Sequence, residues 1–114
     1  MVIRQGDVWW CDLPAPTRAG PGFRRPILVV QGDPLNLSRL ATIVCVPLTS
    51  NLGWMEAPGN VPLSKRASRL PKDSVAMVSQ IIAVDRDLFT KHVGRIPRRL
   101  LEEVLEGIDV VLDR

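Results

Sequence analysis

The feature that most constrains this chain is a succession of short apolar runs, each interrupted by proline, glycine or polar residues. The runs lie at 7–13, 26–31, 41–48, 60–63, 74–80 and 81–84, the last two forming two short strands or one bent strand. Each run suits a strand better than a helix because it is short and ends at turn residues. We therefore expect five or six strands, separated by loops such as the Pro- and Gly-rich stretch at 14–23.

An amphipathic helix is expected near the C-terminus. Pro97 suits the first helical position, where the missing N–H of proline costs nothing. Beyond it, apolar residues recur at helical spacing: Leu101, Val104, Leu105, Ile108, Val111 and Leu112. Glu102, Glu103 and Glu106 fall on the opposite side, so one face of this helix has to be buried. A shorter helical turn, capped by Asp85, is expected at 85–89.

These elements predict a mainly β fold with α: an SH3-like small antiparallel barrel with a C-terminal helix. The length of 114 residues fits one domain, expected to span 1–114. The stretch 1–6 lacks the apolar core of a signal peptide, and no apolar stretch approaches the roughly 20 residues that span a bilayer. Cys11 and Cys45 lie in apolar runs and suit buried, reduced thiols, which favours a soluble cytoplasmic protein.

The charge balance favours an anionic partner without identifying it. The net charge is +3, and of 15 cationic residues all except Lys65, Lys72 and Lys91 are arginine. Arginine binds phosphate through two parallel hydrogen bonds, so this bias suits nucleic acid. Many basic proteins nevertheless bind no polyanion, so composition alone does not decide the function.

Most catalytic signatures are missing from the sequence. We find no phosphate-binding glycine loop, no dinucleotide fingerprint and no carboxylate cluster at metal-binding spacing. His92 is the single histidine, has no companion to form a metal pair and is expected at the surface or its boundary. No metal site and no cofactor are expected.

Arginine and hydroxyl chemistry remains. Arg24 and Arg25 stand directly before Pro26, and a residue before proline is held extended, which fixes the direction of its side chain. Thr49 follows an apolar strand, where a hydroxyl either caps a turn or contacts a phosphate. From the residues alone, two solvated loop arginines and a turn-capping threonine are an equally open interpretation.

Two of the tryptophans are adjacent in one expected strand. Neighbouring strand residues point to opposite faces, so Trp9 and Trp10 cannot both lie in the core of a one-sided sheet. One of them lies either at a dimer interface or as a partly covered surface residue. Trp54, in a polar loop, either stacks on an RNA base or holds its loop in place.

Five segments follow one another in a familiar order. They read GDVW at 6–9, RPILVV at 25–30, VPLTS at 46–50, KDSVA at 72–76 with QI at 80–81 and VD at 84–85, and VGRI at 93–96. Together they resemble the MazF/PemK family of toxin endoribonucleases from end to end. The resemblance implies an SH3-like barrel, a homodimer, a cognate antitoxin whose disordered tail covers the substrate groove, and cleavage of single-stranded RNA at short motifs.

The same resemblance implies the site residues. Arg25 corresponds to the arginine of the family's catalytic site and Thr49 to its active-site hydroxyl. We expect further RNA contacts from Arg18, Arg24, Ser50, Trp54, Ser79 and Gln80. RNA carries its own nucleophile, the 2′-OH, so no metal is required, and the expected products have a 2′,3′-cyclic phosphate and a 5′-OH.

Some positions depart from the family pattern. Met77 and Ser79 occupy places where some members carry an arginine and an aspartate with acid–base roles, and Ala83 stands where arginine is frequent. Two alternatives stay open: a CcdB-like gyrase-poisoning toxin, which has a similar fold and cuts nothing, and a non-catalytic RNA- or peptide-binding barrel.

Overall fold

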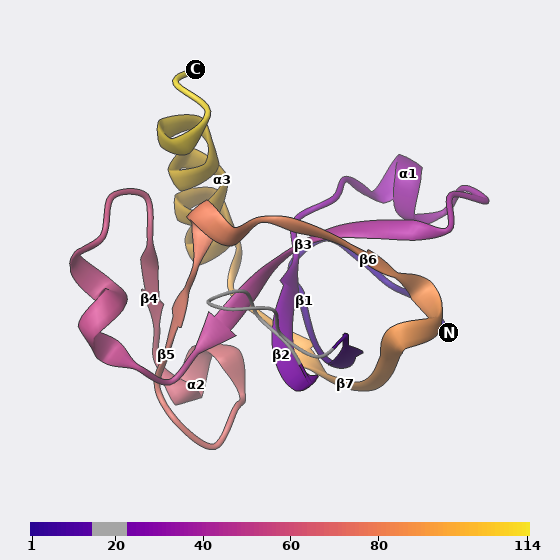
Figure 1. Cartoon of the computed structure of the whole chain (residues 1–114), viewed down its shortest axis with the longest axis horizontal. Coiled ribbons are helices and arrows are strands. Elements are labelled where there is room, and N and C mark those ends of the chain that lie inside the picture. The colour runs from indigo at the N-terminus through magenta and orange to yellow at the C-terminus, as the bar shows by residue number, and fades with distance from the viewer. Residues whose placement is uncertain (15–22) are drawn as a thin grey trace.

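The computed structural model describes residues 1–14 and 23–114. Within these residues an antiparallel sheet of seven strands runs in the order β4-β5-β3-β2-β1-β7, and β6 pairs with β3. The strands are β1 (Asp7–Leu13), β2 (Phe23–Val29), β3 (Thr42–Thr49), β4 (Val61–Leu63), β5 (Ser74–Ala76), β6 (Ile82–Asp85) and β7 (Phe89–Arg95). The sheet curls into a half-barrel with a helix beside it, which confirms the expected small barrel with a C-terminal helix (Figure 1).

The sequence had predicted five or six strands, and the strand it missed is β7. Thr90, Lys91 and His92 are all exposed, so this strand shows no apolar run. His92 stands at the surface as expected, with Nε2 3.5 Å from Oδ1 of the buried Asp7. The segment 74–84 forms two short strands, β5 and β6, as one of the two interpretations had it.

Short helical elements connect the strands. They are the α-helices α1 (Asp33–Asn36) and α2 (Lys65–Ser68), neither of them expected, and the 3₁₀ turns η1 (Leu52–Glu56), η2 (Val78–Gln80) and η3 (Arg86–Leu88). Turn η3 is the helical turn expected at 85–89, but the prediction that Asp85 caps it is wrong, because its side chain makes no capping hydrogen bond.

Helix α3 (Arg98–Val111) begins one residue later than predicted, with Pro97 as its N-cap residue. Its first half is buried against the sheet through Leu101 and Val104. The sheet of the same chain leaves the outer turn uncovered, and Val111 and Leu112 are exposed there. No helix among the described residues is long and apolar enough to cross a membrane.

Two apolar clusters fill the two sides of the curled sheet. The barrel interior holds Ile3, Trp9, Cys11, Leu13, Ile27, Val29, Ile43, Cys45, Val84 and Phe89. The cluster under α3 includes Val8, Leu28, Val46, Leu48, Leu63, Val78, Leu101 and Val104. Successive strand residues alternate between these clusters because their side chains point to opposite faces.

The two adjacent tryptophans of β1 follow this alternation, as predicted. Trp9 lies in the barrel interior and packs edge-on against Phe89. Trp10 lies on the other face, half-buried. The thiols of Cys11 and Cys45 are free and buried in the barrel interior, also as predicted, and burial raises the pKa of Cys11 to about 12.

Candidate functional site

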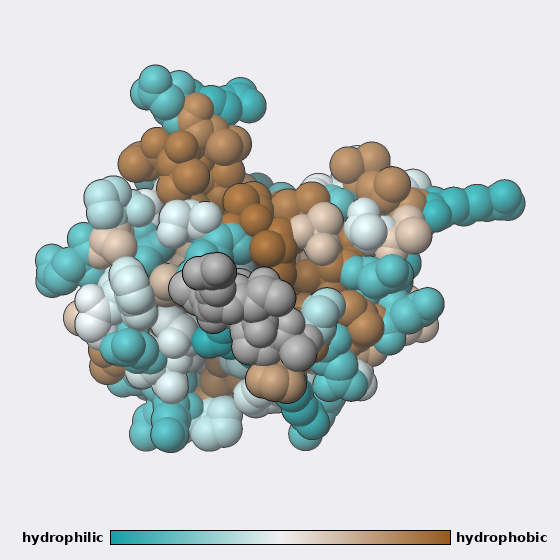
Figure 2. Space-filling model, viewed as in Figure 1, coloured by the Kyte–Doolittle hydropathy of each residue, from teal (hydrophilic) through white to brown (hydrophobic). Residues whose placement is uncertain are grey.

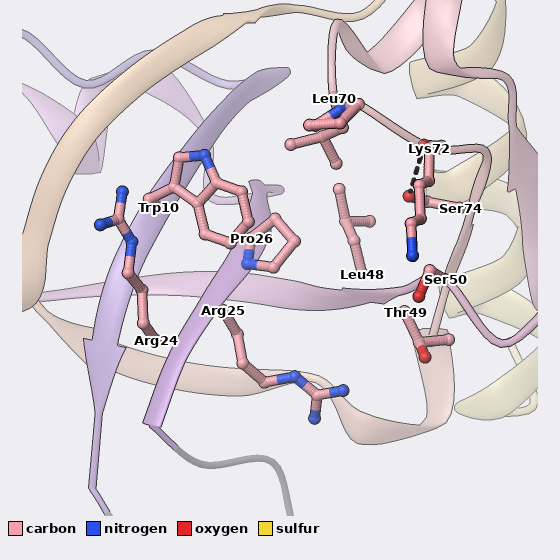
Figure 3. A pocket seen from close by; sticks show the side chains of 11 residues that line it. Trp10, Arg24, Arg25, Pro26, Leu48, Thr49, Ser50, Leu70, Lys72 and Ser74 are labelled. Atoms are coloured by element: carbon pink, nitrogen blue, oxygen red, sulfur yellow. Dashed lines mark hydrogen bonds between the residues drawn. The ribbon is translucent and has the colours of Figure 1, made fainter.

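Two adjoining hollows on the surface share Arg25 and Thr49. The larger has a volume of about 300 Å³ and lies between the start of β2, the end of β3 and the segment between α2 and β5 (Figure 3). The smaller, about 140 Å³, is lined by Arg25, Thr49, Trp54, Met77 and Gln80. Because both hollows contain Arg25 and Thr49, these two side chains stand where the hollows join.

The separation of β2 from β3 opens the space that Arg25 and Thr49 share. Strands β2 and β3 are antiparallel, and their pairing ends at Ile27 and Pro47. Beyond this point Thr49 pairs with Val75 of β5, so Arg25 and Thr49 border the same hollows from two strands that are no longer paired. Both residues are half-buried, so the strands hold the base of each side chain while its polar end reaches the hollows.

Thr49 has a second structural contact. Its Oγ1 accepts a hydrogen bond from the backbone N–H of Asn51 at 3.2 Å, which is the turn-capping interaction that the sequence left open. A hydroxyl both accepts and donates, so this bond leaves the proton of Thr49 to donate toward the hollows. Capping therefore orients the hydroxyl and does not exclude a phosphate contact.

The larger hollow combines an apolar floor with a charged rim. The floor is formed by Trp10, Pro26, Leu48, Leu70 and Pro71. The Arg24 guanidinium carbon lies 4.9 Å from the centre of the Trp10 ring, a cation–π contact that holds Arg24 along one side. Figure 3 shows Arg25 extending away from Arg24 toward the Thr49 side, and Lys72 approaching from the opposite wall near Ser50 and Ser74.

The charges around both hollows have one sign. Among the described residues that line them, Arg24, Arg25 and Lys72 are cationic, and none is Asp, Glu or His. Opposite charge is attracted more strongly in a partly buried hollow than in open water. An apolar floor with cations and hydroxyls around it suits a nucleotide, which has a flat base and a charged phosphate.

The structure brings together most of the residues that the sequence singled out. Arg24, Arg25, Thr49 and Ser50 line the larger hollow, and Trp54 and Gln80 line the smaller one. Ser79 is exposed on η2 and lines neither hollow. Arg18 lies outside the described residues.

Trp10, Lys72 and Met77 are among the lining residues that escaped the sequence reasoning as ligand contacts. The alternation of Trp9 and Trp10 was the available signal for Trp10, since only one of them fits the barrel interior. The signal for Lys72 was its place at the start of the KDSVA segment, although only the fold shows that it reaches the hollow from a separate loop. In the described part of the chain, no three His, Cys, Asp or Glu side chains gather as a metal-binding group.

The fold and the site define a small β-barrel protein. Its two adjoining hollows together form a cation-lined groove, which suits a nucleic-acid strand. Residues 4–112 match the family of PemK-like, MazF-like toxins of type II toxin–antitoxin systems, and the chain belongs to this family. The match confirms the resemblance carried by the five sequence segments.

Named relatives and solved structures agree with this assignment. Endoribonuclease MazF6 of Mycobacterium tuberculosis is 43% identical over 113 residues, covering 99% of each chain. Endoribonuclease EndoA of Bacillus subtilis is 26% identical and covers 98% of this chain and 96% of its own. In fold, the chain resembles MazF from Deinococcus radiodurans with a TM-score of 0.82, at 22% identity and coverage of 100% and 99% of the two chains.

Proposed function

We propose that this member of the toxin family is a sequence-specific endoribonuclease that cuts single-stranded RNA and so blocks translation and growth. The observation that carries the proposal is the place of Arg25 and Thr49, a guanidinium and a hydroxyl at the junction of two hollows with a cationic rim. Family membership and the names of the relatives support the same activity. Residues 1–114 act in this proposal as one toxin domain in the cytoplasm.

The chemistry uses the nucleophile that RNA itself carries. The 2′-oxygen attacks the neighbouring phosphorus, the bond from phosphorus to the 5′-oxygen breaks, and the products are a 2′,3′-cyclic phosphate and a 5′-OH. Negative charge grows on the phosphoryl oxygens during this exchange. Arg25 binds these oxygens through its permanent charge and two N–H groups, while Thr49 donates a hydrogen bond that orients the same phosphate.

Proton transfer completes the reaction. The 2′-OH releases a proton, and the departing 5′-oxygen takes one up, so the protons balance. Arginine rarely gives up its proton, which makes Arg25 a charge clamp and not the acid. Since no carboxylate or imidazole lines the described part of the hollows, we assign both transfers to solvent water.

The two hollows give the RNA a path across the site. With the scissile phosphate at Arg25 and Thr49, the nucleosides on its two sides occupy the two hollows. Trp54 and Gln80 contact a base on one side, by stacking and by amide hydrogen bonds. On the other side Arg24, Ser50 and Lys72 hold the backbone over the apolar floor. Arg18 and Ser79 are proposed to contact RNA beyond the hollows.

A cognate antitoxin is the proposed protein partner. The cationic groove suits an acidic, disordered tail that would occupy the RNA path and block it. A structurally similar endoribonuclease of a mycobacterial species, with a TM-score of 0.74 and 20% identity, was solved in complex with its cognate antitoxin. The complex of that similar protein with its own antitoxin supports the proposal of an antitoxin partner here.

A homodimer is the proposed assembly. Val110 and Leu112 are 61% and 55% exposed on the outer end of α3. Figure 2 shows apolar surface on this outer end and across the middle of the same face toward β6. Such a continuous apolar face is typical of an interface between copies. Light scattering should give twice the monomer mass, and V110D should shift the protein toward the monomer.

The test is an end-mapped cleavage assay. Purified protein, shown to be folded and free of antitoxin, is incubated with single-stranded RNA in excess chelator beside R25A. We expect discrete wild-type cuts with cyclic phosphate ends that are absent in the variant. Intact RNA in both reactions would overturn the proposal in favour of a gyrase-poisoning toxin or a non-catalytic barrel.

A further inference from the structure

We propose that Asn60 is a positioning residue that sets the sequence specificity of cleavage by joining the two walls of the smaller hollow. This inference rests on the proposed RNA cleavage and adds a determinant that does not itself touch the RNA. The side chain of Asn60 lies behind the hollow, between the turn that carries Trp54 and the turn that carries Gln80.

The hydrogen bonds of the Asn60 amide reach both turns at once. Its Nδ2 donates to the carbonyl oxygen of Trp54 in η1 at 3.0 Å and lies 3.5 Å from Sδ of Met77. Its Oδ1 accepts from the backbone N–H of Val78, the first residue of η2, at 3.0 Å. Trp54, Met77 and Gln80 make up the lining apart from Arg25 and Thr49. A single side chain therefore sets the spacing of the two walls.

Turn η1 depends on this connection. Its other hydrogen bonds are local: Gly53 to the side chain of Asn51, Trp54 to the carbonyl of Asn51, and Ala57 to the carbonyl of Trp54. Within residues 1–14 and 23–114, the bond from Asn60 is the hydrogen bond that ties η1 to the opposite wall. Without it, η1 keeps its packing against β4 and β5 but loses the hydrogen bond that fixes the carbonyl of Trp54 relative to η2.

The position of Asn60 is itself fixed from the far side. Gly59, directly before it, has φ +84° and packs so closely on Gly107 of α3 that neither glycine has room for a Cβ. The backbone N–H of Asn60 donates to the carbonyl of Ala57 at 3.1 Å. Because the backbone at Asn60 is held in this way, the side-chain amide can hold η1 and η2 in fixed positions.

A hollow of about 140 Å³ discriminates between bases only if its walls keep their spacing. A pocket selects one base because the other bases cannot form the same hydrogen bonds and contacts with its walls. If a wall can move, other bases can form such contacts and selectivity falls. Arg25 and the backbone of Thr49 are held in β2 and β3, and the Thr49 hydroxyl is bonded to Asn51 at the start of η1, not to the part of the turn that Asn60 holds. Loss of Asn60 should therefore relax specificity more than it slows cleavage of the preferred RNA.

The experiment compares N60A and N60D with a matched control. Both variants lose the donor to Trp54, but N60D keeps an acceptor for the Val78 N–H. The control is N36A, which removes a buried side-chain amide that bonds to Gln31 and Asp33 and lines neither hollow. Each protein is incubated with a randomised single-stranded RNA pool, and the new ends are sequenced. In parallel, kcat and KM are measured on the preferred RNA and on RNAs changed by one base, together with Tm and hydrogen exchange at Val78.

For N60A and N60D we expect the ratio of kcat/KM between preferred and one-base-changed RNA to fall about tenfold. The kcat on the preferred RNA should change much less. The Val78 amide should lose protection from exchange in N60A and keep it in N60D. N36A should lower Tm and leave the cleavage profile at that of the wild type. If N60A does not fold, N60D alone carries the test.

An unchanged profile in N60A or N60D would overturn the inference and leave Asn60 a purely structural residue. Loss of kcat with an unchanged base preference would overturn it as well. If the wild type leaves RNA intact, the proposed function fails and this inference fails with it. A wild type that cuts with an unchanged variant profile rejects only the role of Asn60, so the two failures are distinguishable.

Discussion

The two faces of β1 and β2 differ sharply although they are built from neighbouring residues. Toward the barrel interior these strands present Trp9, Cys11 and Ile27, which are buried among other apolar side chains. Toward the larger hollow they present Trp10 and Pro26, which remain half-buried, and Arg24, which is exposed. The side chains of the first face are buried and stabilise the fold. Those of the second face remain partly exposed and can be covered by a ligand.

This difference teaches that stability and chemistry can be changed separately in this molecule. The residues that line the groove are less buried than core residues, and their polar ends can therefore reach an anion. Because side chains alternate along a strand, a substitution on one face leaves the packing of the other largely in place. Variants of the groove residues and of the core residues should therefore fall into two classes, those that lose activity and those that lose stability.

The largest effect on activity is expected from R25A, because Arg25 stands at the open end of the barrel-interior face of β2 and reaches both hollows. Removal of one donor that stabilises developing charge costs roughly 100- to 1,000-fold in rate, while a substitution outside the core changes stability by about 0.5 kcal/mol or less. The measurements are single-turnover cleavage and thermal unfolding. R25K, which keeps the charge but loses the planar fork, serves as the control and should fall between R25A and the wild type. Normal cleavage by R25A would remove Arg25 from the site.

The opposite result is expected for I27A, two residues further along the same face of β2, where the strand is covered on both sides. Ile27 is fully buried, so its truncation should cost about 2–5 kcal/mol of unfolding free energy. Cleavage per folded molecule, measured at low temperature, should stay close to that of the wild type. Urea titration gives the first quantity, with I27V as a milder control. A specific loss of cleavage at full folding would show that core packing at Ile27 also controls the Arg25 site.

A smaller effect is expected from K72Q at the rim of the larger hollow. If Lys72 neutralises a phosphate next to the scissile one, KM should rise several-fold while kcat stays nearly constant. The slope of log affinity against log salt should fall by about 0.7 for each phosphate of a single strand that the protein no longer neutralises. K65Q, an exposed lysine of α2 that lines neither hollow, is the matched control. Equal salt slopes for K72Q and the wild type would contradict the role of Lys72 at a phosphate.

The smallest effect concerns the thiols of the barrel interior. Burial raises the pKa of Cys11 from 9.0 to about 12 and raises that of Cys45 as well. The folded state therefore disfavours the thiolate, so stability is full below pH 9 and decreases as the pH rises from there toward 12. Tm measured from pH 7 to 10.5 should fall only above about pH 9. At pH 8, iodoacetamide should label the urea-unfolded chain and spare the native one, and rapid native labelling would contradict this.

Much of the fold followed from local pattern. The runs at 7–13, 26–31 and 41–48 and the helical spacing after Pro97 indicated their elements because burial on one face leaves a periodic trace. Strand β7 left none, since most of its side chains face water. The short helices α1 and α2 escaped because four residues are too few to show a period.

The site was predictable only in part, for a related reason. Arg25 and Thr49 each adjoin a strong strand, so their positions follow once those strands are paired. Trp10, Lys72 and Asn60 come from three separate segments, and their convergence depends on the tertiary fold. The exposed position of Ser79 depends on the 3₁₀ turn η2, where the sequence indicated a strand.

The contact between Gly59 and Gly107 has a mechanical consequence. Glycine inside a helix costs about 1 kcal/mol relative to alanine, yet a Cβ at Gly107 would collide with the carbonyl of Gly59. Backbone therefore meets backbone, with no flexible side chain between them to absorb a displacement. Helix α3 cannot slide or turn about its axis without moving the segment that leads to Asn60. A displacement of α3 at Gly107 is therefore expected to displace Gly59 and the neighbouring Asn60 as well.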